Sequence, residues 1–234
     1  MPLFQTITKK LTHWKRLQTH VKQAVAQEEA RHEKFGKYME AAKKLARCDK
    51  EQLQTLINFI ARGVQAELFD WAFSGKEGFG DPESLLFPSY ATITDDGRSA
   101  NEFLIRAIRE DDPFALSEYI VLPWPWNDKR LTDCFMYIGT KNNPWRFDPI
   151  NHNIALYKPF NVGFVGGGNH SLATGIVKGC GIVERYELVD MRGIYEFLYC
   201  DGLHYRAKES NAIIHNVPIM ELGAIFEIGR LMLE

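Results

Sequence analysis

The sequence predicts an α+β fold, with a helical front half followed by a small mixed β-sheet with helices. Apolar residues recur at three- and four-residue steps over residues 4–71, which is the period of an amphipathic helix. After residue 118, short runs rich in β-branched and aromatic residues alternate with glycine, proline and asparagine. A glycine- and proline-rich segment at residues 75–98 separates the two patterns. We therefore expect a helical region over residues 1–98 and an α+β domain over residues 99–234, either as separate domains or around one shared core.

The front half begins with a long helical stretch. An apolar stripe runs from Phe4 to Val25, and residues 27–47 continue with a helical, highly charged sequence. Residues 1–24 hold five basic residues and no acidic one. This basic arm is a candidate contact for nucleic acid or an anionic surface, although packing of its apolar stripe against later helices is the more common arrangement.

Two capping-box patterns mark further helix starts. The pattern at Asp49 precedes a strong apolar stripe that ends at Ser74, and this helix is expected to be the hub of the helical region. Ser99 with Glu102 predicts a second, short helix that continues to residue 108.

The remainder of the chain alternates strand and helix signals. A strand at residues 119–122 enters a proline- and tryptophan-rich loop at residues 123–127, which either lines a pocket or packs in the core. A short helix follows from Asp128, and the last helix begins near Pro218. Five more strands are expected at residues 154–157, 162–165, 182–189, 194–200 and 203–206, with a two-residue hairpin turn at residues 201–202.

Composition excludes several classes of protein. With 45% hydrophobic residues among 234, the chain can bury a full core, and its net charge of −2 argues against a protein dominated by nucleic-acid or membrane electrostatics. No apolar run of about 18 residues is present, so we expect no membrane span and a cytoplasmic protein with free thiols. The four cysteines lack the spacing of a zinc site, so no metal site is expected, and no motif identifies a cofactor.

The sharpest motif is a run of three glycines within residues 160–179. Gly166, Gly167 and Gly168 follow a β-type run and precede apolar residues at helical spacing, for which Asn169 or Ser171 is a suitable cap. Such a turn lets backbone N–H groups approach a ligand, and the helix start favours an anion, so we expect phosphate or carboxylate there. The alternative is that the glycines only form a tight corner.

Residues 165–171 resemble the signature loop of the ParB/sulfiredoxin-like superfamily, which is written D-G-x-H-R or G-G-C-H-R. Gly168 and His170 match the signature glycine and histidine. Ser171 stands in place of the signature arginine, Asn169 in place of the catalytic cysteine of sulfiredoxin, and Gly167 in place of the ParB aspartate. The resemblance implies a ParB/sulfiredoxin-like fold with a nucleotide or another phosphorylated ligand at the loop, and it argues against sulfinic-acid reduction.

Two further resemblances add little chemistry. The helical front half followed by N-H-N-I-A-L-Y and G-G-N-H-S is similar to an uncharacterised bacterial domain family, which implies no activity. Residues 168–170 also match the G-N-H block of calcineurin-like metallophosphatases, but Ser171 breaks that block and the other metal blocks are missing. A two-metal hydrolase is therefore disfavoured.

The candidate catalytic residues are two histidines. His170, at the predicted helix start, could donate to phosphate or act as a general acid, and the helix N-terminus should lower its pKa. His152 precedes a neighbouring strand and is the second candidate. Arg192 or Arg206 is a candidate replacement for the missing signature arginine. Structural roles remain open for both histidines, as does exposed salt bridging for both arginines.

Three function hypotheses follow. The first is a protein that binds a nucleotide or other phosphorylated ligand at the glycine turn, with nucleotide hydrolysis, nucleic-acid cleavage or no turnover all left open. The second is a non-enzymatic interaction or accessory module with a helical partner surface. The third is nucleic-acid binding through residues 1–24 and the tryptophan loop. The sequence leaves an oligomer possible and does not decide whether the protein is an enzyme.

Overall fold

The computed structural model describes residues 2–74 and 82–234, with side chains described for residues 19–74 and 84–234. The described helices are α1 (Pro2–Cys48), α2 (Gln52–Ser74), α3 (Asp128–Tyr137), α4 (Asn169–Val177) and α5 (Met220–Leu233), with short 3₁₀ turns η1 (Pro82–Leu85), η2 (Ala100–Phe103) and η3 (Arg192–Glu196). The described strands are β1 (Ile105–Arg109), β2 (Phe114–Ala115), β3 (Ile120–Leu122), β4 (Asn153–Lys158), β5 (Val162–Gly167), β6 (Ile182–Val183), β7 (Tyr186–Asp190), β8 (Leu198–Cys200), β9 (His204–Ala207) and β10 (Ile213–Asn216). The predicted α+β fold class is confirmed.

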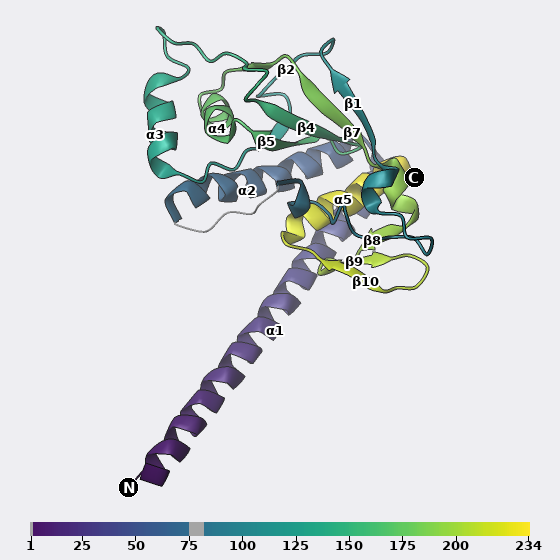
Figure 1. The fold of residues 1–234 in the computed structure, drawn as a ribbon. Helices are drawn as coiled ribbons and strands as arrows, with labels where there is room; N and C mark the ends of the chain where they lie inside the picture. The colour runs from purple at the N-terminus through teal and green to yellow at the C-terminus, as the bar shows by residue number, and fades with distance from the viewer. Residues whose placement is uncertain (1, 75–81) are drawn as a thin grey trace.

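The central sheet has five strands in the order β1-β7-β4-β5-β3. The β3–β5 and β4–β7 pairs are parallel, and the β1–β7 and β4–β5 pairs are antiparallel. Successive side chains of a strand point to opposite faces, so the alternate residues of β4 enter two different cores. Tyr157 packs with α2 and α5 on one face, and Leu156 packs with α4 on the other (Figure 1).

The larger core joins the two halves of the chain. It contains Leu53 and Ile57 of α2, Phe164 of β5 and Phe226 of α5, all of them buried. The hub helix predicted at residues 52–74 is confirmed, and it lies directly beneath the sheet. The helical region and the β-rich region therefore share one hydrophobic core. A three-stranded sheet, β10-β9-β8, and a two-stranded sheet, β2-β6, complete the described strands.

Helix α1 projects from this body as a long arm (Figure 1). At 47 residues it is about 70 Å long, and its C-terminal part packs against α5 through residues such as Phe35 and Ala42. Val21 and Val25, farther along the arm, are exposed. Of the five basic residues in the predicted basic arm, residues 1–24, only Lys22 has a described side chain.

The helix predicted from Ser99 to residue 108 is wrong. The capping box forms, with Ser99 N–H donating to Glu102 Oε1 at 2.7 Å, but it caps only the single turn η2. Residues 105–109 instead form β1, because each of them pairs with β7. Tertiary strand pairing here overrides a local helix signal.

Two strand predictions also need correction, and two strands are not predicted. Residues 182–189 are divided between β6 and β7, and the first part of 194–200 belongs to η3, so that only Leu198–Cys200 is a strand. The sequence does not predict β2 or β10: β2 has only two residues, and three of the four residues of β10 are exposed. Among the described residues, no helix is both long and apolar enough to cross a membrane.

Candidate functional site: the glycine turn and the start of α4

The predicted strand-turn-helix unit is confirmed. Strand β5 ends at Gly167, Gly168 adopts a left-handed conformation with φ of +76°, and α4 begins at Asn169. The carbonyl of Gly168 accepts the first helical bond, from Leu172 N–H at 2.9 Å. Glycine is suited to Gly168 because a Cβ atom is disfavoured at this φ.

The glycines are packed closely against residues 151–153. A Cβ added to Gly167 would lie 2.6 Å from the Asn151 carbonyl oxygen, and one added to Gly168 would overlap the His152 ring. A Cβ at Gly166 would only touch Asn153, at 3.8 Å. The tight-corner interpretation therefore accounts for Gly167 and Gly168, whose backbone faces protein rather than an open cavity on this side.

His152 is a fully bonded, buried residue on this closed side. Its Nδ1 accepts the Asp148 N–H at 3.0 Å, so the neutral ring carries its proton on Nε2. Nε2 lies 2.8 Å from Ser171 Oγ and donates to it, and Ser171 Oγ in turn donates to the Gly168 carbonyl at 3.0 Å. The ring also stacks on Trp145 at 5.0 Å, and burial lowers the pKa of His152.

This hydrogen-bond chain decides what the Ser171–His152 pair can do. A general base must accept the serine proton, whereas His152 Nε2 donates a proton to Ser171. The pair is therefore built to hold the glycine turn together, not to activate a nucleophile.

His170 lies on the opposite side of the turn. It is the second residue of α4 and is 9% exposed, yet its Nε2 is buried and finds no hydrogen-bond partner among the described residues. The edge of its ring meets Trp126, with centroids 4.7 Å apart. Burial lowers the pKa of His170, and the positive charge of Arg130 lowers it further, while a hydrogen bond to the Asn127 backbone acts in the opposite direction.

The start of α3 lies beside the start of α4. Asn127 caps α3 by accepting the Arg130 N–H at 2.8 Å, and Asn169 Oδ1 accepts the Trp124 N–H at 2.6 Å. The tryptophan loop is thereby fastened to the first turn of α4, and the two helices pack together (Figure 1). Two helix N-termini, each with a partial positive charge, meet next to the Arg130 guanidinium. Asp128 in the first turn of α3 offsets part of this positive charge.

Neither predicted arginine reaches the glycine turn. Arg192 forms an ion pair with Asp190 at 2.5 Å, and Asp190 pairs with Lys158, at the end of β4 opposite the turn. Arg206 lies on β9 of the separate three-stranded sheet and forms an ion pair with Asp201 at 2.5 Å. Salt bridging is the observed role of both side chains.

Arg130 is the residue of this site that the sequence does not predict. The tryptophan loop, which contains Trp126, is predicted to line a pocket or to pack in the core, and the helix after it is predicted only as short. The available signal was the position of Arg130, in the first turn of a helix that follows a strand parallel to β5. Only the parallel pairing of β3 with β5 brings the starts of α3 and α4 to the same edge of the sheet.

A smaller cavity of about 260 Å³ adjoins the turn on the closed side. Its lining includes Gly166, Asn153 and Arg185. The Arg185 guanidinium lies 2.8 Å from Glu110, so part of its charge is already compensated. This cavity is a less favourable place for a phosphate than the junction of α3 and α4.

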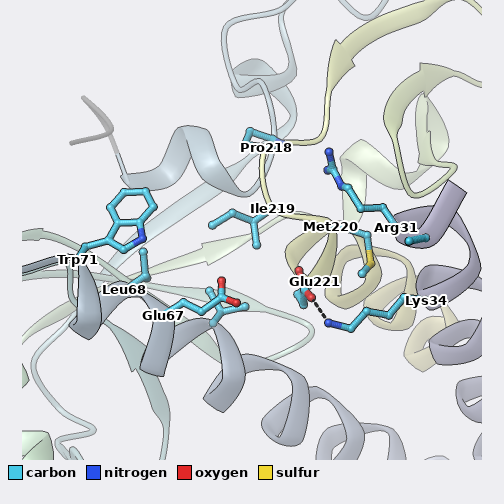
Figure 2. A pocket seen from close by; sticks show the side chains of 11 residues that line it. Arg31, Lys34, Glu67, Leu68, Trp71, Pro218, Ile219, Met220 and Glu221 are labelled. Atoms are coloured by element: carbon cyan, nitrogen blue, oxygen red, sulfur yellow. Dashed lines mark hydrogen bonds and ion pairs between the residues drawn. The ribbon is translucent and has the colours of Figure 1, made fainter. Parts of the chain in front are cut away.

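A separate groove of about 470 Å³ lies where α1 joins the body (Figure 2). It is lined by α1, α2 and the segment before α5, with Trp71 at one end. The ion pair between Lys34 and Glu221, at 2.5 Å, crosses the other end, and Leu68 and Met220 add apolar surface. None of its lining residues belongs to the glycine turn, so it is an independent surface.

No group of three or more potential metal ligands occurs in the described part of the chain. Among the cysteines, Cys200 is buried, and burial raises its pKa to about 12. A thiol with that pKa is a poor nucleophile near neutral pH.

Comparisons with known proteins give one match. The model of a family described as "Family of unknown function (DUF6710)" matches residues 20–234. No curated protein and no solved structure matches the chain.

Proposed function

Because the chain belongs to this DUF6710 family of unknown function, we propose its function from its geometry: it binds a nucleotide or another phosphorylated ligand where α3 and α4 begin. The observation that carries the proposal is His170, a buried histidine at a helix start whose Nε2 has no partner among the described residues. Buried polar groups are nearly always hydrogen-bonded, so an unpaired one marks a place where a ligand completes the bonding.

Arg130 supports the same proposal. The resemblance to the ParB/sulfiredoxin-like loop lacked its arginine, and Arg130 supplies a guanidinium beside His170 from the neighbouring helix. The phosphate would accept hydrogen bonds from Arg130 and from the N–H groups at the start of α4. Trp126, which is half exposed and lies against His170, must turn aside for the ligand to reach Nε2, and its ring then offers a stacking surface for a base.

Binding is the part of the function that the geometry supports. His152 donates to Ser171, so no activated serine is present for hydrolysis, and a hydrolase would have to use His170 as its general acid. The free thiols of the four cysteines support a cytoplasmic location as part of this proposal.

The test is titration calorimetry with sulfate, phosphate, pyrophosphate and ATP, with phosphate release measured in parallel. Wild-type protein should bind at least one of these anions. Arg130→Gln should weaken binding about tenfold or more with unchanged thermal stability, because a charge-assisted hydrogen bond contributes about 1.5–3 kcal/mol. Arg192→Gln is the matched control and should bind normally. Absence of binding to wild-type protein at millimolar anion, or an equal loss in the control, would contradict the proposal.

The exposed part of α1 favours a second candidate function, a protein-interaction module. Val21 and Val25 are exposed on a helix that leaves the body, which supports a protein-interaction module. Val21→Glu/Val25→Glu should remove a specific partner in quantitative pull-down experiments from native cells. Val177→Glu, at an equally exposed valine on α4, is the control. Identical recovered proteins for all three chains would argue against the interaction module.

A further inference from the structure

Strand β1 is an uncovered edge of the central sheet. It pairs with β7 on one side and has no strand on the other among the described residues. All five of its residues are exposed, including Ile105 at 68% and Ile108 at 53%. An exposed edge with isoleucine on both faces is a template for pairing with another strand.

The sheet face beside this edge is also uncovered. A depression of about 530 Å³ lies over β1 and β7, and Ala107, Leu188 and Pro159 provide much of its apolar lining. Arg109 and Asp190 border it. The helix α4 covers the opposite half of this face, so the apolar area beside β1 continues directly to the sheet edge.

We propose that β1 pairs antiparallel with β1 of a second copy of this chain, with the two Ala107 residues opposite each other on a two-fold axis. In this register Ile105 faces Arg109 of the second copy, and Arg106 faces its Ile108. A two-fold contact must be self-complementary, and this strand meets that condition, since no two like charges lie opposite each other. The small Ala107 side chains allow close approach at the axis.

The charges of the neighbouring strand complement this register. Ile105 pairs with Asp190 of its own β7, so Arg109 of one copy lies in the same row as Asp190 of the other, two strands away. That separation is about 9–10 Å between backbones, which a long arginine side chain spans. Asp190 already holds Arg192 of its own chain, so Arg109 of the second copy is a second cation beside this carboxylate. On the other face, Glu187 forms an ion pair with Arg106 of its own chain at 2.6 Å, so these two charges are compensated within each copy.

The central row is apolar throughout. Ala107 pairs with Leu188, so the row reads Leu188, Ala107, then Ala107 and Leu188 of the second copy. The pairing forms one continuous ten-stranded sheet and extends the apolar depression across the axis. The apolar central row, the absence of opposed like charges and the row of Arg109 and Asp190 together favour a second copy over an unrelated peptide.

The first test is the oligomeric state of the full chain by sedimentation velocity over a series of concentrations. Wild-type protein should be a dimer, and Ile105→Arg should raise the dissociation constant at least tenfold, because it places two arginines opposite each other at both ends of the pairing. Ile150→Arg is the matched control, since Ile150 is an exposed isoleucine in the turn before β4 and is not part of β1. The double variant Ile105→Arg/Arg109→Glu should restore the dimer by making the opposed pair attractive.

A second measurement uses only wild-type protein, so it does not depend on whether the variants fold. Amide hydrogen exchange of wild-type protein should slow at residues 105–109 as the protein concentration rises. A monomer at every concentration, a dimer that Ile105→Arg does not weaken, or exchange in β1 that is independent of concentration would each overturn the proposal.

Discussion

Two histidines beside one glycine turn differ in their hydrogen bonding. His152 and His170 are both buried, and burial lowers the pKa of both. His152 exchanges hydrogen bonds with Asp148 and Ser171, whereas His170 Nε2 has no partner among the described residues. Burial alone therefore does not distinguish the two histidines, whereas their hydrogen bonds do: His152 is bonded within the turn, and His170 is the proposed ligand contact.

The difference arises from the hydrogen-bond donors and charges that surround each imidazole ring. His152 lies in a tight loop whose own backbone N–H, at Asp148, satisfies Nδ1. His170 lies where two helix starts and the Arg130 guanidinium add positive potential, which Asp128 in the first turn of α3 offsets in part. Under the proposed function, the phosphate of the ligand lies on this side of the turn.

The largest expected effect comes from disturbing the turn that separates the two histidines. Gly168→Val places a β-branched residue at φ of +76° and drives its side chain into the His152 ring. We expect a loss of about 2–5 kcal/mol in unfolding free energy and a fall of about 10 °C in melting temperature, measured by calorimetry. Gly166→Ala, where a Cβ only touches Asn153, is the control and should lose far less. Equal stability of the two variants would contradict the packing argument.

Exchanging each histidine for phenylalanine tests the comparison directly. His152→Phe removes the partners of the Asp148 N–H and of Ser171 Oγ from a part-buried position and should cost about 1–3 kcal/mol in unfolding free energy. His170→Phe removes the unpaired Nε2 together with the hydrogen bond to the Asn127 backbone, so it should cost less stability than His152→Phe, while anion binding is lost. Urea unfolding and calorimetric titration measure the two quantities. A large stability loss in His170→Phe with intact anion binding would reverse the assignment of the two roles.

Stability should also depend on pH through these histidines. A histidine with a lowered pKa binds protons less readily in the folded protein than in the unfolded chain, so acid favours unfolding. The unfolding free energy should therefore decrease as the pH falls from about 6.5 to 5, above the range where most carboxylates titrate. His152→Phe should flatten this dependence. A stability that rises as the pH falls through this window would contradict the lowered pKa values.

Ligand binding should raise the pKa of His170, whereas burial lowers it. An anion next to Nε2 favours the protonated ring and raises its pKa, so binding takes up a proton. Sulfate does not titrate near neutral pH, and its affinity should therefore increase as the pH falls from 8 to 6 in calorimetric titrations. His170→Phe should abolish this increase, and an affinity that does not change with pH in wild-type protein would exclude His170 from the contact.

Much of the fold was readable from local sequence. The stripe after Asp49 predicts α2, and the three glycines predict the turn between β5 and α4, because period and backbone freedom are local properties. The error at residues 99–108 has a nonlocal cause. A true capping box predicts a helix, but pairing with β7, about 80 residues later, makes this segment a strand.

The candidate site could be predicted only in part, because it too depends on nonlocal strand pairing. His170 and the turn follow from the motif, whereas Arg130 is 40 residues earlier and joins them only through the parallel β3–β5 pair. Arg192 and Arg206 were candidates because they are arginines near later strands. Their partners, Asp190 and Asp201, lie two and five residues away in sequence, and such short separations favour local salt bridges.

The smallest expected effect concerns Arg206. Its ion pair with Asp201 lies at the surface, where such pairs contribute about 0–1 kcal/mol, so Arg206→Gln should change the melting temperature by no more than about 3 °C. It should leave anion affinity unchanged, in contrast to Arg130→Gln, because β9 belongs to a different sheet from the glycine turn. Calorimetric titration of both variants under the same conditions separates a specific site from general attraction of anions to positive charge. If the two variants lost affinity equally, the binding would depend on net charge, and the junction of α3 and α4 would lose its special role.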